Sequence, residues 1–221
     1  MKKILLIICL AAVSAGVSAQ SVNFGLKAGL NLSTMRISPG DPDYTTSNKS
    51  GYHLGVVADI SLQNFSLQPG LYYITKGQKF SGQSAFYGGD GFGTITEKGT
   101  VRLDYLELPV NLIYNLKVAP DVKIYFGAGP YLGYGLSGKT QAAFSSDNMS
   151  GTFEKNITFS GNQPSDYTNP DYGLNFIVGE RLKHFSIDVN YSLGLANVVP
   201  KEQGSKFKNS AAGISIGYWF K

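Results

Sequence analysis

The sequence predicts an all-β fold: an eight-stranded, antiparallel, up-and-down β-barrel that spans a membrane with short periplasmic turns and long external loops. Three observations predict it. Eight stretches alternate apolar and polar residues, as expected of strands that have one lipid-facing side and one lumen-facing side. Short and long connections alternate between these stretches, and many glycines fall on their polar side. Small inward residues are typical of a narrow barrel whose lumen is filled by side chains.

Each predicted strand is long enough to cross a bilayer at a tilt. The last stretch shows the alternation most clearly, because the apolar residues from Ala212 to Phe220 are separated by Gly213, Ser215, Gly217 and Trp219. The predicted strands cover residues 22–32, 52–62, 65–76, 102–116, 122–134, 171–180, 185–195 and 212–220.

The connections determine the predicted topology. The short links are expected at residues 63–64, 117–121 and 181–184, and the long ones at 33–51, 77–101, 135–170 and 196–208. Outer-membrane barrels have short periplasmic turns and long external loops, so an even strand number places both termini in the periplasm. The longest link is expected to contain a strand pair of its own around residues 142–159.

The N-terminus resembles a secretory signal peptide. Lys2 and Lys3 precede an apolar run from Ile4 to Val13, and Val17-Ser18-Ala19 matches a cleavage site. The run is too short for a transmembrane helix. We therefore expect residues 1–19 to be removed, leaving residues 20–221 as one barrel domain in the cell outer membrane.

Composition excludes several classes of function. The chain has one cysteine, which lies within the predicted signal peptide, so neither disulfides nor thiol chemistry is expected. Of the 19 basic residues, two lie in that peptide, so 17 remain against 15 acidic residues. This near balance, without a basic patch, argues against nucleic acid as a partner. No His/Cys pair at ligand spacing, calcium loop or phosphate-binding glycine loop is present, so neither a metal nor a cofactor is expected.

Charged residues on the polar side of the strands predict a buried network in the lumen. Lysines there are expected to pair with carboxylates, because an unpaired buried charge is costly. The predicted network, which is structural rather than catalytic, consists of Lys27, His53, Asp59, Lys76, Glu107, Lys123 and Asp188.

Pro69, Pro109 and Pro130 fall inside predicted strands, where they predict bulges or displaced strand ends. The main alternative fold is a soluble barrel of the lipocalin type, with its apolar face turned inward around a ligand. The glycine-rich polar face would make a poor soluble exterior, which favours the membrane barrel.

A family resemblance is carried by five segments: Tyr105-Leu106-Glu107-Leu108-Pro109-Val110, Gly127–Gly133, Asp171–Phe176, Tyr191–Leu195 and Gly25–Asn31. Together they resemble the PorT-like outer-membrane β-barrel proteins of Bacteroidota. The resemblance spans nearly all of the chain after the signal peptide and implies an eight-stranded barrel in the outer membrane. The namesake of that family is associated with protein secretion across the envelope, but most members have no assigned activity.

The favoured function is that of a non-enzymatic membrane protein: a scaffold, an envelope or secretion-assembly factor, or a surface-binding protein that acts through its external loops. Its expected partners are outer-membrane lipid and envelope or secretion-system proteins. Rigidly held loops commonly carry binding residues. The candidates for binding are the aromatic loop residues Tyr44, Phe86, Tyr87, Phe144, Phe153 and Tyr167.

Two alternative functions remain open from the sequence. The first is a lipid- or peptide-modifying enzyme that uses His53 as its base; a triad would also need a serine and a carboxylate, and Asp59 lies roughly 20 Å away along the same strand. We therefore expect no catalytic residues. The second is a narrow pore, although eight strands leave no aqueous channel.

Overall fold

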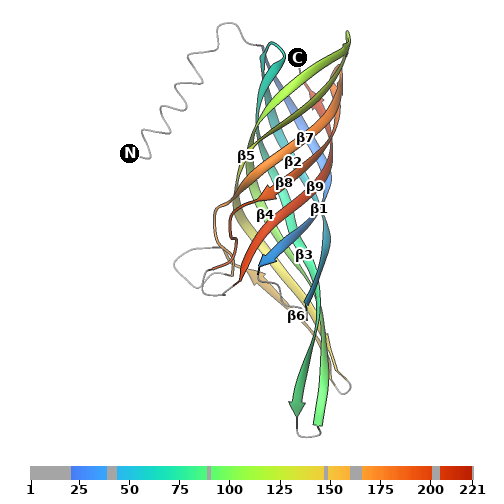
Figure 1. Cartoon of the computed structure of the whole chain (residues 1–221), viewed down its shortest axis with the longest axis vertical. Helices are drawn as coiled ribbons and strands as arrows, with labels where there is room; N and C mark the ends of the chain where they lie inside the picture. Colours follow the sequence, from blue (N-terminus) through green and yellow to red (C-terminus); the bar gives the residue numbers. More distant parts are fainter. Residues whose placement is uncertain are drawn as a thin grey trace, which may run out of the picture.

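Pairing between neighbouring strands closes the chain into a ring. The computed structural model describes residues 21–38, 44–88, 91–146, 149–159, 166–200 and 205–220. Within this described part, eight strands pair antiparallel in chain order, and the last pairs with the first (Figure 1). The predicted eight-stranded antiparallel barrel is confirmed. The ring consists of β1 (Val22–Ser38), β2 (Tyr44–Leu62), β3 (Phe65–Gly88), β4 (Gly91–Ala119), β5 (Val122–Ser145), β7 (Asp171–Leu182), β8 (Phe185–Gly194) and β9 (Lys206–Trp219).

The two ends of the barrel differ. At one end, which we call the turn end, two-residue turns at Gln63-Asn64, Pro120-Asp121 and Lys183-His184 join the strands. Gln63 and Lys183 have positive φ angles of 58° and 51°, as tight hairpin turns of this kind require. The three short links are therefore confirmed, and the strands run almost to their tips. The opposite end, which carries the longer connections, we call the loop end.

Most of the predicted long loops are extensions of the strands, so their prediction as loops was wrong. β3 and β4 stay paired as far as Gly88 and Gly91, and the additional strand β6 (Ser150–Ile157) pairs with the far part of β5. The strand pair predicted near residues 142–159 is confirmed. These extensions form a sheet that continues beyond the rest of the barrel (Figure 1). We call it the projecting sheet; it contains residues 44–48, 78–88, 91–100, 138–145 and 150–157.

Exposure alternates along each strand in the way that the sequence predicts. In β9, residues from Ala211 onward are alternately buried and exposed. Large apolar side chains such as Leu30, Leu54 and Ile216 are exposed on the outside, whereas Lys76 and Asp188 are buried inside. A polar interior inside an apolar exterior is the opposite of a lipocalin-type barrel, so that alternative is excluded.

Aromatic rings on the outward face gather at two levels. Near the turn end, ring centroids lie 5.2 Å apart for Phe65 and Tyr114, and 5.4 Å apart for Phe185 and Tyr218. Towards the loop end, a second group contains Tyr52, Tyr73, Tyr134, Tyr172 and Tyr191, all on the same outward face. Two such girdles mark the upper and lower interfaces of a membrane-spanning barrel. The apolar band between them is therefore the part that meets lipid.

The three strand prolines produce neither bulges nor displaced strand ends, so that prediction was wrong. Pro69 interrupts pairing only with β2, Pro109 only with β3, and Pro130 only with β4. The register is the same on both sides of each interruption. Proline lacks one N–H donor, and here each loss is confined to one of the two ladders that the strand makes.

An apolar cluster closes the lumen at the loop end. Residues from the β6–β7 and β8–β9 connections cover the opening of the barrel at the loop end, which we call the mouth. Backbone hydrogen bonds hold these connections in place: Thr168 N donates to Val198 O at 2.9 Å, and Val198 N donates to Phe207 O at 2.8 Å. Burial of these side chains stabilises the closed mouth. The cluster contains Met35, Ile74, Val101, Leu103, Tyr105, Ile157, Tyr167, Val198 and Val199.

The predicted signal peptide, residues 1–19, lies outside the described residues. The described residues contain no helix that is both long and apolar enough for a membrane crossing.

Candidate functional site

The largest charged cluster in the lumen surrounds Lys76. Its Nζ lies 2.5 Å from Glu107 Oε2 and 3.2 Å from Asp171 Oδ2, and all three side chains are almost completely buried. The rings of Tyr131 and Tyr105 lie 4.5 Å and 5.3 Å from the same nitrogen, measured to their centroids. A buried ammonium held between two carboxylates and two aromatic faces has its charge compensated on every side.

Hydrogen bonds extend the Lys76 cluster across the barrel. Asn209 on β9 donates to Asp171 Oδ2 at 2.9 Å and to the Tyr105 hydroxyl at 3.2 Å. The cluster thus joins β3, β4, β5, β7 and β9, which are far apart in sequence. Several of its members, among them Tyr105, Glu107, Tyr131 and Asp171, come from the segments that resemble the PorT-like proteins. Those segments build the interior of the barrel, so they carry information about fold rather than about a ligand.

A second charged cluster lies nearer the turn end. Lys27 Nζ lies 2.8 Å from Asp188 Oδ2, which also accepts a hydrogen bond of 2.8 Å from the Tyr125 hydroxyl. The only tryptophan of the chain, Trp219, packs beside Lys27, with 5.7 Å between Nζ and the ring centroid. Polar and aromatic side chains therefore fill the barrel at this level too.

Asp59 has a different partner from the one expected. Arg181 Nη1 lies 3.2 Å from Asp59 Oδ2, and its guanidinium carbon stacks 4.2 Å from the Trp219 ring centroid. Lys123 was expected to pair with a lumen carboxylate, but it forms no ion pair in the described part of the chain and lies directly opposite Arg181 across the β5–β7 ladder. The sequence analysis assigned Arg181 to a turn, whereas β7 continues through it and turns its side chain into the lumen.

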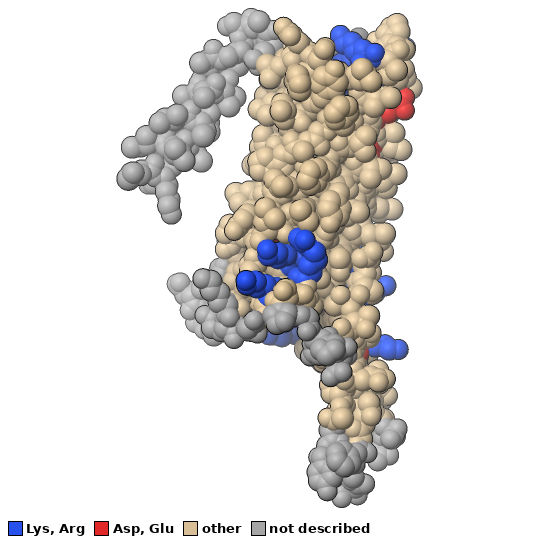
Figure 2. All heavy atoms as spheres, in the orientation of Figure 1, with Lys and Arg blue, Asp and Glu red and all other residues tan. Residues whose placement is uncertain are grey.

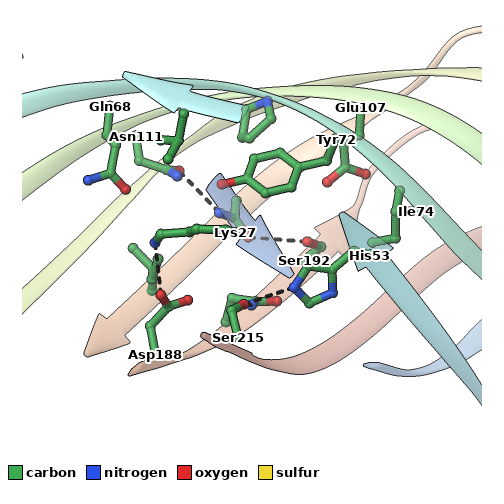
Figure 3. A pocket seen from close by; sticks show the side chains of 15 residues that line it. Lys27, His53, Gln68, Tyr72, Ile74, Glu107, Asn111, Asp188, Ser192 and Ser215 are labelled. Carbon is green, nitrogen blue, oxygen red and sulfur yellow. Dashed lines mark hydrogen bonds and ion pairs between the residues drawn. The ribbon is translucent and has the colours of Figure 1, made fainter. Parts of the chain in front are cut away.

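His53 lies in a small enclosed cavity of about 50 Å³ (Figure 3). Its Nε2 is 2.8 Å from Ser215 Oγ on β9, two strands away. The strand between them places Gly29 directly opposite both residues. A Cβ atom at Gly29 would lie 2.6 Å from the His53 ring, so only glycine lets the imidazole reach across to Ser215.

This histidine–serine contact does not form a hydrolytic triad. The nearby carboxylate of Asp188 is bound through Oδ2 to Lys27 and Tyr125, and no carboxylate contacts the His53 ring in the described residues. A cavity of about 50 Å³ has room for a few waters but not for a lipid or peptide group. The described residues also contain no group of three His, Cys, Asp or Glu side chains that could bind a metal.

The aromatic candidates divide into three groups. Tyr44, Phe144 and Phe153 all lie on one face of the projecting sheet, the face that continues the lumen side of the barrel. Tyr167 is largely buried in the apolar cluster, where it also lines the cleft described below. Phe86 and Tyr87 belong to β3, but their side chains lie outside the described residues.

The three aromatic residues share their face with a fourth, Phe80, which sequence analysis missed. The Phe80 ring lies over Gly99, where a Cβ atom would be 2.3 Å away, and Phe80 also packs against the apolar cluster at the mouth. The Tyr44 hydroxyl donates to Glu97 Oε2 at 3.1 Å. We call Tyr44, Phe80, Phe144 and Phe153 the aromatic face.

A cleft of about 910 Å³ lies beside the aromatic face at the loop end. Most of its wall is apolar, with a few polar groups such as Thr46 and Gln78. Concave, largely apolar sites with a few polar groups are typical of ligand-binding surfaces. Its apolar lining includes Met35, Ile37, Tyr44, Phe80, Val101, Tyr167 and Phe207.

Comparison with known proteins agrees with this architecture. Residues 18–199 match the family described as "Outer membrane protein beta-barrel domain". The chain belongs to this family. It is therefore an outer-membrane β-barrel protein, which agrees with the apolar band and the aromatic girdles. A search of curated proteins finds no match.

Solved structures of small outer-membrane barrels are similar over most of their length. The attachment invasion locus protein Ail of Yersinia pestis is 14% identical, with 90% of this chain and 98% of that chain covered and a TM-score of 0.41. Neisserial surface protein A is 12% identical, with 90% and 99% covered and a TM-score of 0.42. OprG of Pseudomonas aeruginosa is 12% identical, with 91% and 97% covered and a TM-score of 0.44.

Proposed function

We propose that this protein is a non-enzymatic surface-binding barrel that captures an external partner on its aromatic face and in the adjoining cleft. The observation that carries the proposal is the position of Tyr44, Phe80, Phe144 and Phe153 on one face of a sheet that projects beyond the barrel. Tyr44 and Phe153 are 37% and 47% exposed, although aromatic rings gain free energy when they are buried. A partner that presents apolar groups would bury them.

The filled lumen supports the same conclusion by leaving the interior without room for transport. The Lys76 cluster, the Lys27–Asp188 cluster and the apolar cluster at the mouth lie at successive levels of the barrel. Side chains fill the interior of an eight-stranded barrel in this way and block an aqueous channel. Function is then carried by the surfaces outside the ring.

We propose that the loop end faces the outside of the cell and that both termini lie in the periplasm. The support is the contrast between the two-residue turns at one end and the long hairpins at the other, which is the usual asymmetry of outer-membrane barrels. A membrane-impermeant thiol reagent applied to intact cells tests this. It should label Lys98→Cys on the projecting sheet and leave Lys183→Cys at the turn end unlabelled; the opposite labelling would reverse the orientation.

The resemblance of five segments to the PorT-like proteins leads us to propose a class of partner as well. The segments that carry the resemblance are barrel strands that alternate between lumen-facing and outward residues, so what they support is a shared scaffold. On such a scaffold the partner would be an envelope or secretion-system protein that meets the projecting sheet.

Capture from intact cells tests the proposed function. The tagged protein is crosslinked in its native host and purified, and the proteins recovered with it are identified. The double variant Tyr44→Ser/Phe153→Ser should lose the recovered partner. The control variant Gln141→Ala/Glu154→Ala removes polar side chains from the opposite face of the projecting sheet and should retain it. Equal recovery with both variants would contradict the assignment of the aromatic face.

A further inference from the structure

Three basic side chains lie together on the outward face near the ends of β1 and β9. Arg36 and Lys208 are directly opposite each other in the β1–β9 ladder, and Lys206 is opposite Ser38, two residues further along. Arg36 Nη2 donates to Gly194 O at 2.8 Å, which directs its guanidinium across β9 towards the end of β8. The space-filling view shows a compact basic patch over this part of the barrel (Figure 2). We call these three residues the basic patch.

The basic patch lies just beyond the apolar band. The last outward apolar residues on the two strands, Leu32 and Ala212, are paired, and the girdle residue Tyr191 lies opposite Ala212. Arg36 follows Leu32 by four residues, a distance of about 13 Å along a tilted strand. The patch therefore reaches the level of the lipid headgroups, above the aromatic girdle.

The charges of the basic patch have no acidic partners among the described residues, whereas two other outward basic residues at the loop end, Arg102 and Lys139, do have them. Arg102 pairs with Asp104 at 2.9 Å, and Lys139 pairs with Glu154 at 2.7 Å. None of the three patch residues forms an ion pair in the described part of the chain. Like charges directly opposite each other destabilise a strand pair, so an anion between Arg36 and Lys208 would relieve the repulsion.

We propose that the basic patch binds the phosphate groups of membrane-lipid headgroups. Lipid phosphates are the anions that lie at this height around a barrel, and a guanidinium with two ammonium groups provides several donors for one phosphate. Which leaflet supplies the lipid rests on the orientation proposed above. If the loop end faces outward, the ligand is a phosphorylated lipid of the outer leaflet. One lipid molecule would then be ordered against the β1–β9 side of the barrel.

Native mass spectrometry of the full chain, refolded in a zwitterionic detergent, tests the patch independently of orientation. Diphosphorylated lipid A is the probe, and its phosphate-free form is the comparison lipid. The variant Arg36→Gln/Lys206→Gln/Lys208→Gln should weaken binding of lipid A about a hundred-fold, since each basic residue near an anionic surface contributes about a factor of five. The control variant Lys79→Gln/Lys98→Gln/Lys117→Gln loses the same charge elsewhere and should bind as the wild type does.

Heat-modifiable migration on a gel confirms that each variant is folded before its binding is measured. The proposal is supported if the wild type prefers lipid A to the phosphate-free form and the patch variant loses that preference. It is overturned if the wild type binds both lipids equally, or if the patch variant and the control variant bind lipid A alike. The orientation is tested separately by the thiol labelling, so the two failures can be told apart.

Discussion

Replacing Lys76 with methionine should strongly destabilise the barrel. The change removes one ammonium and leaves the Glu107 and Asp171 carboxylates, which lie 2.5 Å and 3.2 Å from it, buried without their cation. Breaking a buried ion pair by removing one partner costs about 3–5 kcal/mol. We expect a loss of that size in the free energy of unfolding, because both carboxylates are almost completely shielded from water.

Neutralising the two carboxylates should recover part of the loss. In Lys76→Met/Glu107→Gln/Asp171→Asn no uncompensated charge remains, and Asn209 can still donate to position 171. Buried amides that lack some hydrogen bonds cost about 1–3 kcal/mol. Set against about 3–5 kcal/mol for Lys76→Met, the middle of each range predicts a triple variant about 2 kcal/mol more stable than Lys76→Met. Lys139→Met, which removes a cation from the exposed pair with Glu154, is the matched control and should not shift the unfolding midpoint.

Urea unfolding in lipid vesicles, followed by the fluorescence of Trp219, measures these differences. The single tryptophan lies inside the barrel beside Lys27 and Arg181, so its emission reports loss of the lumen packing. A cost below about 1 kcal/mol for Lys76→Met would refute the argument that the charge is compensated only within this cluster. A triple variant no more stable than Lys76→Met would refute it as well.

Three further predictions follow from other parts of the structure. Gly29→Ala places a Cβ atom 2.1 Å from the Ile214 carbonyl oxygen and should destabilise the barrel by about 1–3 kcal/mol in the same assay, whereas Gly133→Ala, whose nearest neighbour would be 3.5 Å away, should be close to neutral. Purified protein in planar bilayers should give no steady single-channel conductance, because side chains fill the lumen at several levels; stable ohmic steps would contradict this. Burial opposes ionisation of Asp166, but its hydrogen bonds with Lys155 and Thr158 outweigh that and lower its pKa below the ordinary 3.8. Because the pKa of Asp166 is lowered in the folded state, its ionised form stabilises the fold above pH 3.8, and this stabilisation is lost as the pH falls below that value. Hydrogen exchange of the Thr158 amide, which donates to Asp166 at 3.1 Å, should therefore accelerate below pH 3.8. In Asp166→Asn the exchange rate of this amide, corrected for intrinsic exchange, should not depend on pH.

The sequence predicted the barrel well because its membrane-spanning strands are under a strict constraint. Lipid on one side and a packed polar lumen on the other enforce alternation. The two-residue period by itself therefore assigns Leu30 to the outward face and Lys27 to the lumen. Beyond the apolar band this constraint ends. The projecting sheet is held by backbone pairing and scattered aromatic contacts, so its Gly- and Ser-rich strands resemble loops in sequence.

The lumen contacts were only partly predictable for a related reason. Alternation places Lys76 and Glu107 inside, but it does not say which strands face each other across the barrel. Asp171 on β7 pairs with Lys76 on β3, although these two strands are not neighbours in the ring. Arg181 was missed because strand ends cannot be located closely from sequence, and Ser215 because only the glycine at position 29 lets His53 cross a strand.

The measurement that tests the central claim most directly is site-specific photocrosslinking in intact cells. A photoreactive amino acid is placed at Tyr44 or Phe153 on the aromatic face, and at Tyr125 inside the lumen or Lys183 at the turn end. The account predicts that one partner is captured from both positions on the aromatic face and from neither of the other two. Capture from Tyr125 or Lys183 alone would show that the working surface is the lumen or the turn end, and would contradict the account.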